Sequence, residues 1–88
     1  MKIDLSHAAE SFLTALPAKQ YKQVAARVLS LSRDQGPKDS RHLSGHPGYK
    51  RLDQGEYRII FHIENNVAYI TNIGKRNDNE VYKQFSRQ

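Results

Sequence analysis

Residues 56–73 read EYRIIFHIENNVAYITNI, and this stretch decides the fold of the chain. Over residues 56–64 apolar side chains recur at every second position, which is the period of a strand with one buried face. Asn65 and Asn66 follow near the centre of the stretch, and asparagine tolerates the positive φ angles of a tight turn. Residues 67–73 are mostly apolar again and supply a returning strand. The stretch therefore predicts an antiparallel β-hairpin.

A shorter strand and a polar loop lie before this hairpin, and a helix is expected after it. Residues 49–53 predict the strand, with a turn at residues 54–55. Residues 37–48, PKDSRHLSGHPG, are mostly turn-forming or polar, which predicts a loop. After the hairpin, either residue of Asn77-Asp78 is a suitable N-cap for a helix that runs to the C-terminus.

The N-terminal third has the 3.6-residue period of helices instead. Residues 2–5 predict one short strand, and Ser6 is a suitable N-cap for a helix that ends at Leu16, before a proline. A second amphipathic stripe covers residues 18–33, so the two helices are expected to form an antiparallel hairpin. The order is β-α-α-β-β-β-α, an α+β fold with a helical hairpin packed on a small, mostly antiparallel sheet. We expect a single domain over residues 1–88.

The composition narrows the class of protein and its surroundings. No cysteine is present, which excludes disulfides, thiolate zinc sites and a cysteine nucleophile. No apolar run approaches the ~18 residues that a membrane span needs, and the first residues lack the apolar stretch of a signal peptide. We therefore expect a cytoplasmic protein without a membrane partner. The net charge is +5 and the pI about 9.7, which favours nucleic acid as the partner.

Five cations are expected to gather at one end of the sheet. Lys50 and Arg51 lie on the first strand of the C-terminal half, Arg58 lies on the next, and Lys75 and Arg76 follow the third. Like charges repel, so such a cluster needs an anion. The paired N–H groups of arginine suit phosphate oxygens, which predicts a phosphodiester site. The alternative is a solvated basic face with scattered ion pairs.

Two further features bear on the chemistry. Tyr82 either belongs to the apolar stripe of the last helix or faces the cations. Beside cations its pKa, ordinarily about 10, would be lowered, which would make it a proton acceptor. His42 and His46 have the spacing of metal ligands, but no cysteine or carboxylate stands at a recognisable spacing from them. We therefore predict solvated loop histidines and no metal site, while the residues alone leave the role of Tyr82 open.

Five segments carry a resemblance to a known family. They are Leu43-Ser44-Gly45, Tyr49-Lys50-Arg51-Leu52, Gly55-Glu56-Tyr57-Arg58-Ile59-Ile60-Phe61, Ile73-Gly74-Lys75-Arg76 and Glu80-Val81-Tyr82. Together they resemble the RelE branch of the RelE/ParE toxin superfamily, the ribosome-dependent mRNA endonucleases of bacterial toxin–antitoxin pairs. The Tyr-Arg-Ile-Ile-Phe strand marks the superfamily. The Gly-Lys-Arg ending followed by Glu-Val-Tyr points to the RNA-cleaving branch rather than the gyrase-inhibiting one.

The resemblance implies a toxin that cleaves mRNA in the ribosomal A site, without metal or cofactor, by attack of the 2′-hydroxyl on the adjacent phosphate. It also implies the catalytic residues. Arg58 would hold the scissile phosphate, and Arg76 would stabilise the developing charge or protonate the leaving oxygen. Tyr82 would be the base on the 2′-hydroxyl, and Lys50 would contact RNA and assist proton transfer. The implied partners are the ribosome and a cognate antitoxin, bound in a hetero-oligomer.

The sequence departs from the RelE pattern in the strand that holds Lys50. RelE has two lysines one residue apart there, and Arg51 is the nearest replacement for the second. We expect Arg51 to bind RNA rather than to share the acid–base role, since arginine positions phosphate but rarely transfers a proton. We expect Lys75 to bind RNA as well. Related branches use histidines or a glutamate for acid–base chemistry. His62, His46 and Glu80 are therefore reserve candidates for the general acid or base.

Two other functions stay open at this point. A ParE-like toxin shares the fold but inhibits a topoisomerase, DNA gyrase, through protein contacts and needs no catalytic tyrosine. A catalytically inactive module that binds an antitoxin or nucleic acid would keep the basic surface without cleaving RNA.

Overall fold

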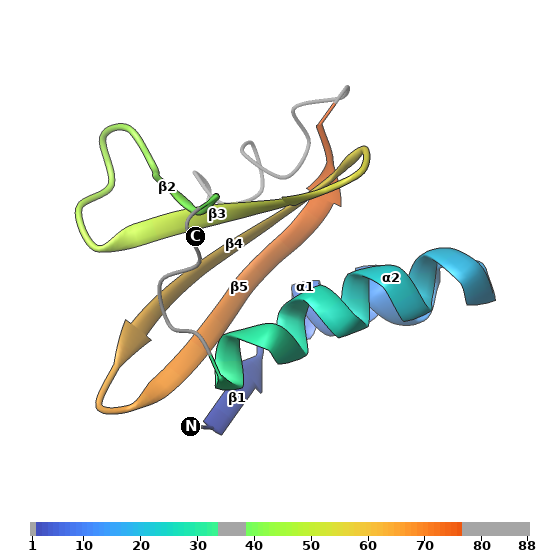
Figure 1. The fold of residues 1–88 in the computed structure, drawn as a ribbon, viewed down its shortest axis with the longest axis horizontal. Helices are drawn as coiled ribbons and strands as arrows, with labels where there is room; N and C mark the ends of the chain where they lie inside the picture. Colours follow the sequence, from blue (N-terminus) through green and yellow to red (C-terminus); the bar gives the residue numbers. More distant parts are fainter. Residues whose placement is uncertain (1, 34–38, 77–88) are drawn as a thin grey trace.

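The computed structural model of the chain describes residues 2–33 and 39–76 (Figure 1). Its elements are β1 (Lys2–Leu5), α1 (His7–Thr14), α2 (Ala18–Leu29), the 3₁₀-helix η1 (Ser30–Ser32), β2 (Arg41–His42), β3 (Tyr49–Gln54), β4 (Tyr57–Glu64) and β5 (Val67–Lys75). The predicted α+β class is confirmed. The helix expected after Asn77-Asp78 lies outside the described residues. In the described ranges no helix is long and apolar enough to cross a membrane.

The described strands form one sheet in the order β1-β5-β4-β3-β2. Neighbouring strands pair antiparallel except β1, which runs parallel to β5. The turn between β4 and β5 has positive φ at Asn65 (51°) and Asn66 (62°), as predicted. Helices α1 and α2 lie together on one side of the sheet (Figure 1). The side that packs against them is called the inner face below, and the opposite side the outer face.

The hydrophobic core lies between the inner face and the two helices. In β4 the alternate residues Tyr57, Ile59 and Phe61 are buried in it, as the period of two predicts. The Tyr57 ring meets Phe12 of α1 edge-on, with ring centroids 6.0 Å apart. The other buried members of the core are Ala9, Leu13, Val24, Val28, Leu31, Leu52, Ala68, Ile70 and Ile73. Because strand residues alternate, Arg58 lies on the outer face.

A β-bulge shifts the register of β5 against β4. Ile60 pairs with Asn72, but the next pair toward the turn skips Thr71, which is therefore the extra residue. The Thr71 carbonyl accepts a hydrogen bond of 2.6 Å from the Ser6 hydroxyl. That hydroxyl also accepts the backbone N–H of Ala9 and so caps α1, as predicted. The bulge and the start of α1 are thus held by the same side chain.

Three parts of the fold differ from the predictions. The helix expected to end at Leu16 ends as α1 at Thr14, two residues earlier. The helix predicted over residues 18–33 ends as α2 at Leu29 and continues as the tighter turn η1. There the Ser30 hydroxyl donates to the Arg27 carbonyl at 2.6 Å, a local bond that competes with regular helix. The loop predicted over residues 37–48 contains the short strand β2, which supplies hydrogen-bond partners to part of the edge of β3.

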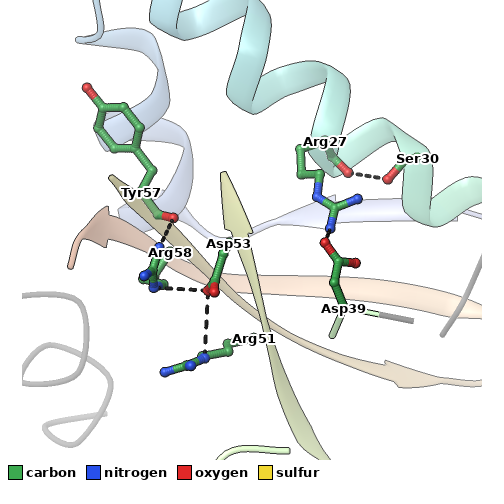
Figure 2. Close-up of polar contacts among 7 residues, drawn as sticks. All are labelled: Arg27, Ser30, Asp39, Arg51, Asp53, Tyr57 and Arg58. Carbon is green, nitrogen blue, oxygen red and sulfur yellow. Dashed lines mark hydrogen bonds and ion pairs between the residues drawn. The ribbon is translucent and has the colours of Figure 1, made fainter. Parts of the chain in front are cut away.

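An ion pair joins α2 to the segment that leads into β2. The Arg27 guanidinium contacts the Asp39 carboxylate, and this hydrogen bond lowers the pKa of Asp39 below its ordinary value (Figure 2). The stabilising effect of the pair is therefore present above the ordinary pKa and is lost as the pH falls through the lowered one. Asp39 is exposed, so salt weakens the pair.

Candidate nucleic-acid interface

Two arginines and an aspartate lie together on the outer face, at the end of the sheet where β3 turns into β4. Asp53 pairs in register with Arg58, and Arg51 lies two residues before Asp53, on the same face. Arg58 Nε lies 2.9 Å from Asp53 Oδ1, and Arg51 Nε lies 3.7 Å from the same oxygen (Figure 2). One carboxylate therefore stands between two guanidinium groups, and the cluster keeps a net positive charge.

Arg58 is also held by the backbone next to it. Its Nη1 donates to the Tyr57 carbonyl at 3.0 Å and to the Gly55 carbonyl at 3.2 Å. The residue is only 8% exposed, and a charge buried to this extent needs partners. Backbone carbonyls and the Asp53 carboxylate supply them. The guanidinium is thus fixed in orientation before any ligand arrives, which lowers the entropic cost of binding one.

Arg76 lies at the same turn. Its backbone N–H donates to the Glu56 carbonyl at 2.8 Å, and the Arg58 side chain binds the carbonyl of the preceding residue. The bulge places Gly74 opposite Arg58, where an unbroken hairpin would place Ile73. Arg76 is therefore two residues, roughly 7 Å, beyond the partner of Arg58. Arg58 and Arg76 approach one turn from adjacent strands.

The two lysines of the predicted cluster start from the other face of the sheet. Lys50 pairs with Phe61 and Lys75 pairs with Tyr57, and both aromatic side chains are buried in the core. Directly paired residues of antiparallel strands point to the same face. The lysines therefore leave the sheet on the inner face, whereas Arg51 leaves it on the outer one. The structure brings Arg51 and Arg58 together, with the backbone of Arg76 at the adjoining turn, but does not add the lysines to them.

Two of the predicted site residues, Tyr82 and Glu80, lie outside the described residues. The position of the Tyr82 phenol relative to Arg58 and Arg76 therefore stays a prediction.

The reserve candidate His62 lies in a row of aromatic rings on the outer face. Its ring stacks on Tyr69 with centroids 5.0 Å apart and planes at 16°, and it lies 4.8 Å from the ring of Tyr49. Both tyrosines are register partners of His62, so the row crosses β3, β4 and β5. Sequence reasoning missed this row. Counting outward from the two turns gives the signal, because both tyrosines then fall opposite His62.

Within the part of the chain that the structure describes, the loop histidines His42 and His46 belong to no group of metal-ligating side chains. His46 lies in a turn, where its backbone N–H donates to the Leu43 carbonyl at 3.2 Å. His42 belongs to β2 and is exposed. Over residues 2–33 and 39–76, histidine, aspartate and glutamate side chains form no group of three that is able to hold a metal ion.

Known structures identify the fold, although the sequence matches no protein-family model and no curated protein. The isolated RelE toxin of E. coli is similar, with a TM-score of 0.75 and 17% identity over 98% of this chain and 95% of that chain. The archaeal RelE–RelB complex from Pyrococcus horikoshii OT3 matches with a TM-score of 0.74 and 21% identity, over 85% and 93%. The toxin–antitoxin complex RelBE2 of Mycobacterium tuberculosis matches with 0.73 and 20%, over 85% and 96%.

The chain is a small basic α+β protein. Its helical hairpin covers one face of a mixed sheet, and its arginine cluster lies on the other face. Its fold is that of the RelE toxins, as the five sequence segments predicted.

Proposed function

We propose that the chain is an endoribonuclease toxin of a type II toxin–antitoxin system, which inhibits translation and growth by cleaving mRNA on the cytoplasmic ribosome. The observation that carries this proposal is the pair Arg51 and Arg58, held on the outer face of a RelE-like sheet with Arg76 at the adjoining turn. Fixed guanidinium groups suit the oxygens of a phosphodiester. The net positive charge supports a nucleic-acid substrate.

The proposed reaction needs a phosphate clamp, a base and a group that stabilises charge. The 2′-oxygen forms a bond to phosphorus while the bond to the 5′-oxygen breaks, which leaves a 2′,3′-cyclic phosphate and a 5′-hydroxyl. Arg58 holds the scissile phosphate, and Tyr82 accepts the proton of the 2′-hydroxyl. Arg76 stabilises the charge on the phosphoryl oxygens, and the leaving oxygen takes its proton from Arg76 or from water.

The pleat of β3 changes one assignment. The resemblance implies that Lys50 contacts RNA, and Arg51 is expected to bind RNA as well, but Lys50 leaves the sheet on the face of Phe61. We assign the contact to Arg51, which shares the outer face with Arg58. Proton transfer by Lys50 has no geometric support, and Lys75 remains a peripheral RNA contact because it is exposed next to Arg76.

Induction of the chain in growing bacteria is expected to stop growth and to produce cuts in a translated message, mapped by primer extension. The variants Tyr82→Phe and Arg76→Ala are expected to lose both effects, since one lacks the base and the other the charge stabilisation. Full growth inhibition by both variants would remove the nuclease proposal. DNA damage signalling without RNA cuts would instead indicate a gyrase inhibitor.

Cleavage is expected to depend on the ribosome, because a tyrosine is a weak base and gains most from an aligned substrate. Purified protein should cut mRNA on programmed ribosomes and leave the same RNA nearly intact in free solution. Equal rates on the two substrates, measured by gel electrophoresis of labelled RNA, would contradict this dependence.

An apolar groove beside the helices suits a segment of the cognate antitoxin. It has a volume of about 400 Å³ and lies between β1, α1 and α2, and its lining is apolar except for the carboxylates Asp4 and Glu10 at its border. Leu29 and Tyr21 line it and are 60% and 40% exposed. Exposed apolar side chains around a hollow are typical of protein interfaces. We propose that the antitoxin lays an apolar helix or extended segment in this groove and places acidic groups near the arginines.

Leu29→Asp is expected to weaken binding of the antitoxin at least about tenfold, because it places a charge in an apolar interface. The measurement is isothermal titration calorimetry of the purified toxin with its purified cognate antitoxin. Gln23→Asp is the matched control, since Gln23 is exposed on the same helix and does not line the groove. Equal losses in the two variants would place the antitoxin elsewhere.

A further inference from the structure

A second hollow lies on the sheet at the edge formed by β1 and β5. It has a volume of about 210 Å³ and is lined by Lys2, Ile3, Asp4, Val67 and Tyr69. Lys2 pairs in register with Val67 and Asp4 with Tyr69, and the intervening Ile3 packs against the core. The four paired residues therefore belong to the outer face, which also carries Arg51 and Arg58.

Tyr69 gives this hollow an aromatic wall. Its ring is half-buried and stacks on His62, which in turn lies against Tyr49. The row fixes the orientation of the ring, and a ring held in this way is a stacking surface for a planar group. RNA-binding proteins use such rings to stack unpaired bases.

Two exposed charges of opposite sign stand beside the ring. Neither Lys2 nor Asp4 makes an ion pair within residues 2–33 and 39–76. The Asp4 carboxylate has two acceptor oxygens and suits a pair of adjacent N–H donors. Guanine presents such a pair on its Watson–Crick edge, at N1 and at the exocyclic amine, whereas adenine and cytosine present one amine and uracil a single N–H. The Lys2 ammonium suits a carbonyl oxygen or a phosphate.

We infer that this hollow is a base-binding subsite, which takes a guanine of single-stranded RNA stacked on Tyr69 and read by Asp4. The inference rests on the proposed function and adds to it a determinant of sequence preference. Tyr69 lies five residues before Gly74, the register partner of Arg58, which is roughly 15 Å along β5. The guanine bound here is therefore a few nucleotides from the scissile phosphate, and the strand between them follows the outer face.

The test uses pentamers of 2′-O-methyl RNA, which lack the 2′-hydroxyl and are not cleaved. Uridine pentamers with one central guanosine, adenosine or cytidine are titrated into the purified protein and followed by NMR. The guanosine pentamer is expected to bind about tenfold more tightly than the others and to shift the resonances of Lys2, Asp4 and Tyr69. Asp4→Asn should remove this preference. Tyr69→Phe should keep the preference, and Tyr69→Ser should lose binding of every pentamer at this edge.

Glu64→Gln is the matched control. Glu64 is an exposed carboxylate on the outer face of β4 and does not line the hollow. Its loss should strengthen binding of all pentamers alike, because a negative charge near the RNA is removed, and should leave the preference intact. Equal affinities for all pentamers, no shift at the β1 edge, or an unchanged preference in Asp4→Asn would each overturn the inference. The assay does not involve cleavage. A guanine preference in the pentamers, together with no cuts on ribosomes, would therefore contradict the proposed nuclease activity but not the base-binding subsite.

Discussion

Arg58→Ala is expected to lower mRNA cleavage about a hundredfold, because it removes a fixed donor to the scissile phosphate. The same variant should lower the free energy of unfolding by about 1–3 kcal/mol. It leaves the carbonyls of Gly55 and Tyr57 without the Arg58 side chain and takes a 2.9 Å ion-pair partner from Asp53. The Asp53 side chain is 39% exposed, so water replaces part of that contact. Primer extension measures the first effect and urea denaturation the second.

Asp53→Asn separates catalysis from folding. In the double variant with Arg58→Ala, neither partner keeps an unpaired charge, so the loss of stability should be smaller than the sum of the two single losses. Cleavage should stay as low as in Arg58→Ala alone. The single variant Asp53→Asn should bind RNA more tightly, since the carboxylate no longer competes with phosphate for Arg51 and Arg58. Recovery of cleavage in the double variant would mean that Arg58 acts through folding only.

The period of two along β4 was enough to predict which of its residues face the core, and two consecutive asparagines were enough to predict the turn. The bulge at Thr71 was not predictable from the hairpin itself. It is held by the hydroxyl of Ser6, 65 residues away in sequence, and it shifts every later pair by one residue. Local patterns therefore predict strands and turns, whereas the register that aligns Arg58 with Arg76 depends on a contact with another element.

The residues of the candidate site were predicted better than the face of the sheet on which each of them lies. Lys50 and Arg51 are adjacent in sequence and equally basic, so charge alone does not tell which of them points outward. The pairing of β3 with β4 decides it, because Lys50 falls opposite the buried Phe61 and Arg51 opposite Ile60. The aromatic row has the same origin. Tyr49 and Tyr69 lie 20 positions apart in sequence. Each lies beside His62 because the two turns set the pairing of β3 and of β5 with β4.

Asn72→Leu is expected to raise the free energy of unfolding by about 1–3 kcal/mol, a large gain for a domain of this size. Asn72 is fully buried on β5 beside the bulge, and within residues 2–33 and 39–76 both polar atoms of its side chain lack a hydrogen-bond partner. Burying an unpaired amide costs free energy, and leucine has nearly the same shape without polar atoms. Thermal unfolding should show a midpoint about 4–8 °C higher per kcal/mol gained.

Asn72→Ala is the control for this prediction. It removes the same unpaired amide but leaves a small cavity, so its gain in stability should be smaller than that of Asn72→Leu or absent. Asn72→Asp should be destabilising, because a carboxylate at a fully buried position loses its hydration without gaining a partner. A loss of stability in Asn72→Leu would mean that the amide is bonded in solution. An unchanged stability with reduced cleavage would mean instead that the unpaired amide serves the outer face, where a ligand supplies its partner.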